Sequence, residues 1–219
     1  MNQLIKFDSS ELLQAHGVDV SSLPLKEQLE EIFKLAEKTL AEDGLTLDNV
    51  IFIIVEVCDM KDRPIVNEVQ KAIWKPENYP ARIILERDGY KAGARVRLLF
   101  TATKAPHVCI NTTEGQIPTG PFSRSAVVGG RVYGSGVRPI SPETQKLVSE
   151  DLKEQARQCL RNLDINMRSS GTSIQKAYSF TVYLTDLANV GKVMEVFAEF
   201  GFDPDKVQIN FEKVRALNE

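Results

Sequence analysis

The sequence is poor in the residue types that most often build metal sites, disulfide frameworks and catalytic triads. Its 219 residues include three cysteines and two histidines, and no CxxC or Cys–His spacing joins them. A zinc site or a disulfide framework is therefore not expected, and the three thiols are expected to be reduced. His16 and His107 have no serine or carboxylate at a recognisable spacing, which argues against a hydrolytic triad.

Long apolar runs and a strong excess of one charge are also missing. No run approaches the roughly 18 apolar residues of a membrane-spanning helix, and the N-terminus lacks the apolar core of a signal peptide. A net charge of −3 and a pI near 5.6 predict no broad basic surface for nucleic acid. We expect a globular cytoplasmic protein without a membrane partner; a local basic patch stays open, but a nucleic-acid partner is not favoured.

What the sequence does contain is one unit written twice. The letters LKEQ stand at residues 25–28 and again at 152–155, each opening an amphipathic helical pattern. Each pattern ends at a glycine, Gly44 or Gly171, and the offset between these glycines equals the offset between the two LKEQ strings. We call this common offset the repeat shift. We interpret LKEQ as a duplicated helix start without a catalytic role.

The repeat shift also pairs the segments that follow. The β-rich runs NVIFIIVEVCD and KAYSFTVYLTD end in Asp59 and Asp186, which we expect to cap the next helix. Short helical patterns come next, RPIVNEVQKAIW and ANVGKVMEVFAEF, and then the strand patterns ARIILER and QINFEKV. With a leading strand before each long helix, the unit is predicted to be an α+β module.

The two copies differ at their ends. Residues 119–128 predict an extra leading strand in the second copy, and residues 93–103 predict an extra closing strand in the first. We therefore expect module 1–105 to lack its first strand and module 106–219 to lack its last. Unpaired sheet edges promote association, so another module or chain is expected to cover them.

Several strings together resemble one known family. Residues 117–139 read IPTGPFSRSAVVGGRVYGSGVRP, followed by QARQCLRNL and SFTVYLTDL, and the first copy contains VNEV and YPARIILE. This sequence resembles the Rid/YjgF family of reactive-intermediate (enamine/imine) deaminases, also called L-PSP endoribonucleases. The resemblance implies tandem chorismate-mutase-like modules, with mixed sheets and helices on one face. It also implies a homotrimer, no cofactor, and ligand sites between modules.

The resemblance further implies a deaminase in which an arginine binds the substrate carboxylate while water attacks the imine carbon. A planar guanidinium can bind both oxygens of a carboxylate, which fixes the orientation of the ligand. The positions that match the ligand-contacting residues of the family are Asn67, Arg82, Phe122, Ser123, Ser135 and Gly136.

The sequence departs from the family pattern at several of these positions. Phe122 replaces the usual tyrosine, and Leu99 stands where the water-activating glutamate would fall, so Glu86 is a candidate substitute. The second copy has Ile209 and Met194 at the positions of the arginine and the asparagine. Because neither copy carries the whole set, any site is expected to be composite, shared between two modules.

Plainer interpretations exist for the same residues. Arg82 could be a surface arginine at a strand end, Asn67 a local helix cap, Phe122 a core residue, and Ser135 with Gly136 a site of close packing. Three functions therefore stay open. The first is a hydrolase that deaminates enamine/imine intermediates of 2-keto acids. The second is a catalytically silent ligand-binding or scaffold protein, and the third, least favoured, is an endoribonuclease.

Overall fold

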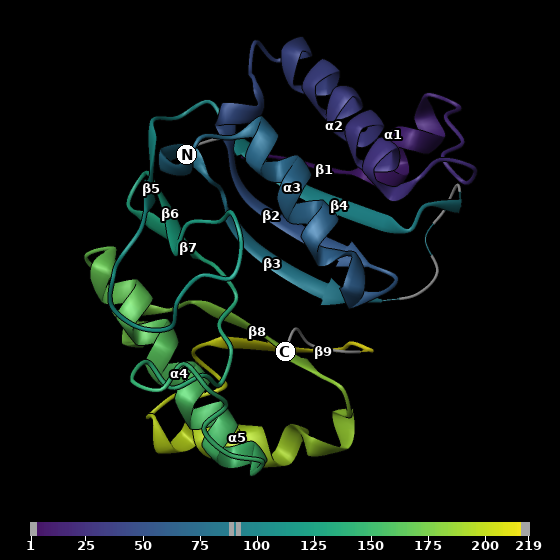
Figure 1. Cartoon of the computed structure of the whole chain (residues 1–219). Coiled ribbons are helices and arrows are strands. Elements are labelled where there is room, and N and C mark those ends of the chain that lie inside the picture. Colours follow the sequence, from purple (N-terminus) through teal and green to yellow (C-terminus); the bar gives the residue numbers. More distant parts are fainter. Residues whose placement is uncertain (1–3, 88–89, 91–92, 216–219) are drawn as a thin grey trace. The chain divides into compact units, whose positions relative to one another are not determined.

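The computed structural model describes residues 4–87, 90 and 93–215, which form two compact units. The first unit contains the chain up to Ile110 together with Thr119–Ser135 and Arg215. The second contains Asn111–Pro118 and Gly136–Val214 (Figure 1). A segment of the second sequence copy therefore belongs to the unit that the first copy builds.

The first unit contains a mixed four-stranded sheet. Its strands are β1 (Leu4–Asp8), β2 (Val50–Val57), β3 (Ala81–Glu86) and β4 (Val96–Thr103), in the order β1-β4-β2-β3. Strands β2 and β3 run parallel, whereas β4 pairs antiparallel with both β1 and β2. The closing strand predicted from the first copy is thus β4, in the interior of the sheet.

Three helices cover one face of this sheet (Figure 1): α1 (Ser9–Ala15), α2 (Leu25–Glu42) and α3 (Arg63–Ile73). Helix α1 was not predicted, because residues up to 10 looked like strand. Strand β1 stops at Asp8, whose carboxylate accepts a 2.8 Å hydrogen bond from the backbone N–H of Ser10 and so caps the new helix. The predicted apolar stripe of α2 is buried in the core: Ile32, Phe33, Ala36 and Leu40.

The first unit also contains a small antiparallel sheet. Its strands are β5 (His107–Ile110), β6 (Ser125–Val128) and β7 (Arg131–Gly134), with β6 in the middle. Strand β5 was not predicted, and the leading strand expected over 119–128 is regular only from Ser125 onward.

Side chains of β6 pack on the first copy. Ala126 and Val128 form an apolar cluster with Ile51 and Ala81. Ser123, two residues before β6, forms an isolated parallel bridge with Ala81 at the start of β3. The segment that leads into β6 therefore lies beside the first residues of β3.

The second unit contains α4 (Leu152–Ser169), α5 (Val190–Glu199) and the parallel strands β8 (Ser179–Leu184) and β9 (Gln208–Lys213). Three phenylalanine rings pack in its core with centroids 4.9 to 5.6 Å apart. They belong to Phe180, Phe197 and Phe202.

The duplication predicted from the sequence is confirmed by the element bounds and the strand register. The repeat shift moves both ends of α2 onto the ends of α4, and both ends of β3 onto those of β9. The strand pairing follows the same shift: Phe52 pairs with Ala81 in the first copy, and the equivalent residues Ser179 and Gln208 pair in the second. Strand β4 has no counterpart among the described residues of the second copy, whose β6–β7 hairpin and β8–β9 sheet belong to different units.

The repeated LKEQ has a structural explanation. The Gln28 side-chain amide donates to two carbonyls of the segment before α2, and Gln155 donates to the Ser149 carbonyl before α4. Each glutamine therefore fixes the chain that enters its helix. The lysines of the motif pair with equivalent glutamates on the next helix: Lys26 with Glu68, and Lys153 with Glu195.

The predicted aspartate caps are confirmed as well. Asp59 accepts a 2.9 Å hydrogen bond from the backbone of Lys61, and Asp186 accepts one of 3.0 Å from Ala188. Both caps begin a short 3-10 turn that leads into α3 or α5. None of the described helices is long and apolar enough to cross a membrane.

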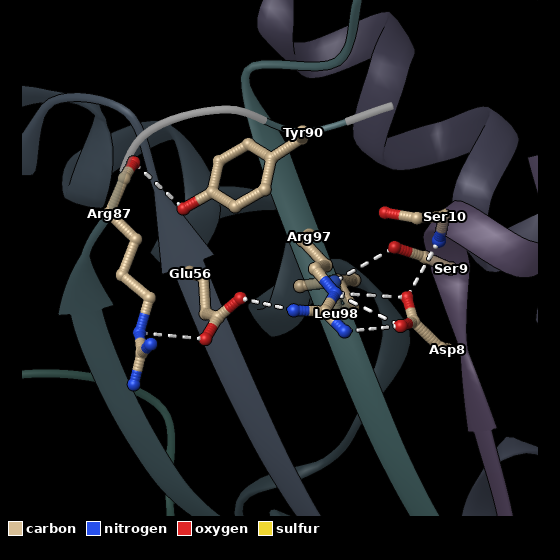
Figure 2. Close-up of polar contacts among 8 residues, drawn as sticks. All are labelled: Asp8, Ser9, Ser10, Glu56, Arg87, Tyr90, Arg97 and Leu98. Atoms are coloured by element: carbon tan, nitrogen blue, oxygen red, sulfur yellow. Dashed lines mark hydrogen bonds and ion pairs between the residues drawn. The ribbon is translucent and has the colours of Figure 1, made fainter. Parts of the chain in front are cut away.

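A row of alternating charges crosses the four-stranded sheet (Figure 2). Arg97 on β4 donates to Asp8 at the end of β1 (2.5 Å) and to Glu56 on β2 (3.1 Å), and Arg87 after β3 pairs with Glu56 (3.0 Å). Glu56 is only 4% exposed. The hydrogen bond to Asp8 is the main cause that raises the pKa of Arg97. A buried carboxylate needs such partners.

We predict that Arg97→Met lowers the free energy of unfolding by about 1–3 kcal/mol, because Asp8 and Glu56 each lose a charged donor. Urea unfolding would measure the change. Lys34→Met, which removes a cation from an exposed helix surface, is the control. Equal losses in the two variants would contradict a structural role for the charged row.

Candidate functional site

The site begins at Arg82, the second residue of β3. Its backbone pairs with Ile53 of β2 in the sheet. Its side chain extends toward α3 and is only 4% exposed. The backbone N–H of Arg82 donates a 2.8 Å hydrogen bond to the hydroxyl of Ser135, just after β7. Arg82 is therefore a buried residue held between the two sequence copies, and not the surface arginine of the plainer interpretation.

The guanidinium of Arg82 has only uncharged partners. Its Nη1 donates to Asn67 Oδ1 at 2.9 Å and to Gln70 Oε1 at 2.5 Å. Its Cζ lies 5.0 Å from the centroid of the Phe122 ring, which is a cation–π distance. No carboxylate in the described part of the chain forms an ion pair with Arg82, and its Nε and Nη2 make no hydrogen bond there.

The electrostatics of this arrangement favour an anion. Burial lowers the pKa of Arg82 to about 9, and the positive charge of Arg63 contributes to this lowering. Because this pKa still lies above 7, the guanidinium carries its charge at neutral pH. Burying a charge without an opposite charge is costly, so a bound carboxylate would stabilise the site.

Helix α3 supplies the polar residues through its periodicity. Arg63, Asn67 and Gln70 stand at positions i, i+4 and i+7, which lie on one face of a helix. Val66 and Val69 lie on the other side and are buried in the core. One face of the helix thus anchors it while the other presents hydrogen-bonding groups to Arg82.

The turn before β6 completes the site. Asn67 Nδ2 donates to the Thr119 carbonyl at 3.3 Å, and Arg63 Nη1 donates to the Thr119 hydroxyl at 3.2 Å. At Gly120, a Cβ atom would lie 2.2 Å from Arg82 Nη2 and 2.7 Å from Asn67 Oδ1. Only glycine leaves room for the guanidinium here.

Gln70 is a site residue that the sequence reasoning missed. An arginine only donates hydrogen bonds, so Gln70 must present its Oε1 to Arg82. Its Nε2 then has no acceptor among the described residues, although the side chain is 1% exposed. Leaving a buried amide donor unpaired costs about 1–3 kcal/mol, which a ligand oxygen would recover. The signal in the sequence was that Gln70 follows Asn67 by three residues, which places both on one face of a helix.

The serines predicted to contact a ligand take part in contacts between the two copies. Ser135 is 3% exposed, and its hydroxyl donates to the Ser123 carbonyl at 2.5 Å while it accepts from the backbone of Arg82. A hydroxyl has one proton, so Ser135 has none left to donate. Ser123 is fully buried. Gly136 is the first residue of the second unit's longer segment.

Glu86, the candidate proton carrier, is held at the far end of β3. It follows Arg82 by four residues, which is about 13 Å along a strand. Its Oε2 accepts a 2.8 Å hydrogen bond from the backbone of Met60, and its Oε1 lies 3.4 Å from Arg215 Nε. Leu99 pairs with Ile54 in the sheet. The structure therefore brings neither residue into hydrogen bonding with Arg82.

The second copy has lost the whole polar set. The repeat shift places apolar side chains at the positions of Arg63, Asn67, Gln70 and Arg82. These side chains are Val190, Met194, Phe197 and Ile209. Of these four, Phe197 is buried in the core of its unit, and the other three are half-buried.

Metal-binding clusters and grooves are other features that mark functional sites. The described residues contain no group of three or more His, Cys, Asp or Glu side chains that could hold a metal ion. A groove of about 340 Å³ lies between α2 and α3, lined by Phe33, Val69 and Ile73 with the Lys26 and Glu68 pair at its edge. None of the predicted site residues lines this groove.

Comparison with known proteins places the chain in a family. The family model described as Endoribonuclease L-PSP matches twice, over residues 13–103 and 113–216. These matches cover most of the chain, which belongs to this family, the Rid/YjgF family, as a tandem duplication. The predicted fold class, two α+β modules of this type, is thereby confirmed.

Individual relatives match about half of the chain. A RutC family protein of Pyrococcus abyssi is 35% identical over 91 residues, which are 42% of this chain and 72% of the relative. Reactive Intermediate Deaminase A, chloroplastic, of Arabidopsis thaliana is 30% identical over 103 residues, 47% of this chain and 55% of that protein.

Among solved structures, RidA from an Antarctic Psychrobacter species is 31% identical with a TM-score of 0.47. The match covers 51% of this chain and 89% of that one.

We predict that Gly120→Ala weakens the binding of a small carboxylate such as 2-oxobutyrate about tenfold, which corresponds to about 1.4 kcal/mol. The added methyl group would displace the guanidinium from Asn67. Calorimetric titration would measure the affinity. Gly191→Ala is the control, because a Cβ at Gly191 meets nothing within 4 Å. Unchanged affinity in Gly120→Ala would show that the guanidinium position does not matter.

Proposed function

We propose that this chain binds a small carboxylate at Arg82 and hydrolyses the imines of 2-keto acids there. One observation carries the proposal: a guanidinium that is 4% exposed has only neutral partners in the described part of the chain. Buried charges in proteins are normally paired. A substrate carboxylate would supply the missing opposite charge.

The neighbouring groups suit a carboxylate. A carboxylate has two oxygens that accept hydrogen bonds, and Arg82 Nη2 and Gln70 Nε2 are donors without acceptors among the described residues. Asn67 and Gln70 hold the guanidinium through Nη1, so the cation is fixed before the ligand arrives. Preorganisation of this kind lowers the cost of binding.

The reaction needs little beyond positioning. Water attacks the imine carbon, a C–O bond forms, the nitrogen takes up protons, and the C–N bond then breaks to release ammonia and the 2-keto acid. An imine next to a carboxylate is already activated toward water, so orientation by Arg82 contributes most. Phe122 provides an apolar wall beside the guanidinium. Because Glu86 is held by Met60 and Arg215, we assign the proton transfers to solvent water.

Relatives support the class of reaction. The Arabidopsis relative carries the name Reactive Intermediate Deaminase A. The small carboxylate or imine partner, the homotrimer and the cytoplasmic location rest on the resemblance and composition alone, and they stay predictions.

A second candidate is a carboxylate-binding protein without catalysis. Leu99 at the position of the family's water-activating glutamate, and the engagement of Glu86 elsewhere, favour it. An RNA-cleaving function has only the family description in its favour. The acidic pI and the absence of a His/Glu constellation in the sequence argue against it.

We predict that Arg82→Ala abolishes ammonia release from 2-aminoacrylate or 2-iminobutyrate generated in situ. It should also weaken the binding of 2-oxobutyrate by about 2–5 kcal/mol, because the ligand charge loses its partner. Arg161→Ala, which removes an exposed arginine from the second unit, is the matched control.

The two measurements separate the candidates. Binding without ammonia release in the wild type would leave the silent-binder function. Equal affinity of wild type and Arg82→Ala for 2-oxobutyrate would refute the carboxylate site itself.

A further inference from the structure

We infer that the Arg82 site selects small dicarboxylates, meaning 2-oxo acids and their imines with a second acidic group, and that Arg63 binds this second group. The inference rests on the proposed function, because it needs the first carboxylate to bind Arg82. It assigns a substrate class and a specificity residue that the resemblance does not supply.

The hydrogen bonds place Arg63 beside the same turn as Arg82. Arg63 Nη1 donates to the hydroxyl of Thr119, and the carbonyl of Thr119 accepts from Asn67. Asn67 in turn accepts from the Arg82 guanidinium. The next residue, Gly120, packs directly against Arg82 Nη2. The two arginines are thus linked through one short stretch of chain.

The charges in this region are unbalanced. Neither Arg63 nor Arg82 forms an ion pair within the described ranges. Asp62, adjacent to Arg63 in sequence, pairs with Arg95 at 2.8 Å instead. The charge of Arg63 lowers the pKa of Arg82, so the two cations interact unfavourably. A ligand with one negative charge relieves one cation, whereas a dianion relieves both.

Two other arginines of the first unit have acidic partners. Arg95 pairs with Asp62, and Arg97 pairs with both Asp8 and Glu56. The protein therefore pairs these two arginines with acidic side chains but leaves the two arginines around Thr119 without acidic partners among the described residues.

The second copy supports treating Arg63 as part of the set. Its equivalent is Val190, and the equivalents of Asn67 and Arg82 are also apolar. By contrast, the exposed pair of Lys26 and Glu68, which bridges α2 and α3, is kept in the second copy as Lys153 and Glu195. The second copy thus has apolar residues at the positions of Arg63, Asn67 and Arg82, while it keeps this exposed pair between the helices.

The test compares two ligands of nearly equal size that differ by one charge, 2-oxoglutarate and its 5-methyl ester. Calorimetric titration measures both with the wild type, Arg63→Gln, Arg63→Lys and Lys71→Gln. Lys71 is an exposed cation on the same helix, so Lys71→Gln removes equal charge away from the site. Arg63→Lys keeps the charge and checks that any loss is not a folding defect.

We expect the wild type to bind 2-oxoglutarate about fivefold more tightly than the ester, as one additional ion pair of about 1 kcal/mol allows. The ratio should fall toward one in Arg63→Gln and persist in Arg63→Lys and Lys71→Gln. It should also shrink at high salt, because salt screens a partly exposed charge.

Other results of the titrations would separate a failure of this inference from a failure of the proposed function. Equal affinity of the wild type for the two ligands would overturn the inference and leave the proposed function intact. A preference that survives in Arg63→Gln, or is lost as much in Lys71→Gln, would overturn the role of Arg63. Failure of both ligands and of 2-oxobutyrate to bind would refute the proposed function, and this inference with it.

Discussion

A buried guanidinium without an acidic partner among the described residues is the constraint on which the rest of the site depends. Arg82 lies under α3, where the amide oxygens of Asn67 and Gln70 orient it but do not neutralise it. The surrounding structure is arranged to tolerate this charge: Gly120 leaves space for Nη2, and the Phe122 ring faces the cation. Evolution keeps costly buried charges mainly where they act on something, so the arrangement favours a function over packing.

The hairpin of the second copy makes the site possible. Strands β6 and β7 belong to the unit built by the first copy, fixed there by the bridge of Ser123 with Ala81 and by the hydroxyl of Ser135. In the first copy, β4 lies between the strand before the long helix and the strand after it. The second copy has no strand in that place among its described residues, and its hairpin belongs to a different unit from β8 and β9. The residues of the candidate site thus come from both copies within one chain.

Much of this could be predicted from the sequence. Periodicity and the repeat shift predicted both long helices, the paired strands and the aspartate caps, because these depend on local patterns. Helix α1 was missed because Asp8 both ends a strand and caps a helix, and the β-like run before it hid the change. Gln70 was missed because its importance lies in an unpaired amide, which only the three-dimensional structure shows. The sequence also did not show that the side chains of Ser135 and Glu86 form hydrogen bonds with backbone groups of Ser123 and Met60.

The most direct test of the account replaces the polar set by apolar side chains of similar size, as the second copy has done. Urea unfolding of the wild type and of the triple variant Asn67→Met, Gln70→Met, Arg82→Met would be measured in anion-poor buffer, with and without 2-oxobutyrate. We expect the variant to be at least as stable as the wild type without the ligand, because a buried unpaired charge has been removed. Added 2-oxobutyrate should stabilise only the wild type. A wild type that is several kcal/mol more stable than the variant without ligand, and that gains nothing from it, would show instead that Arg82 is a satisfied structural residue.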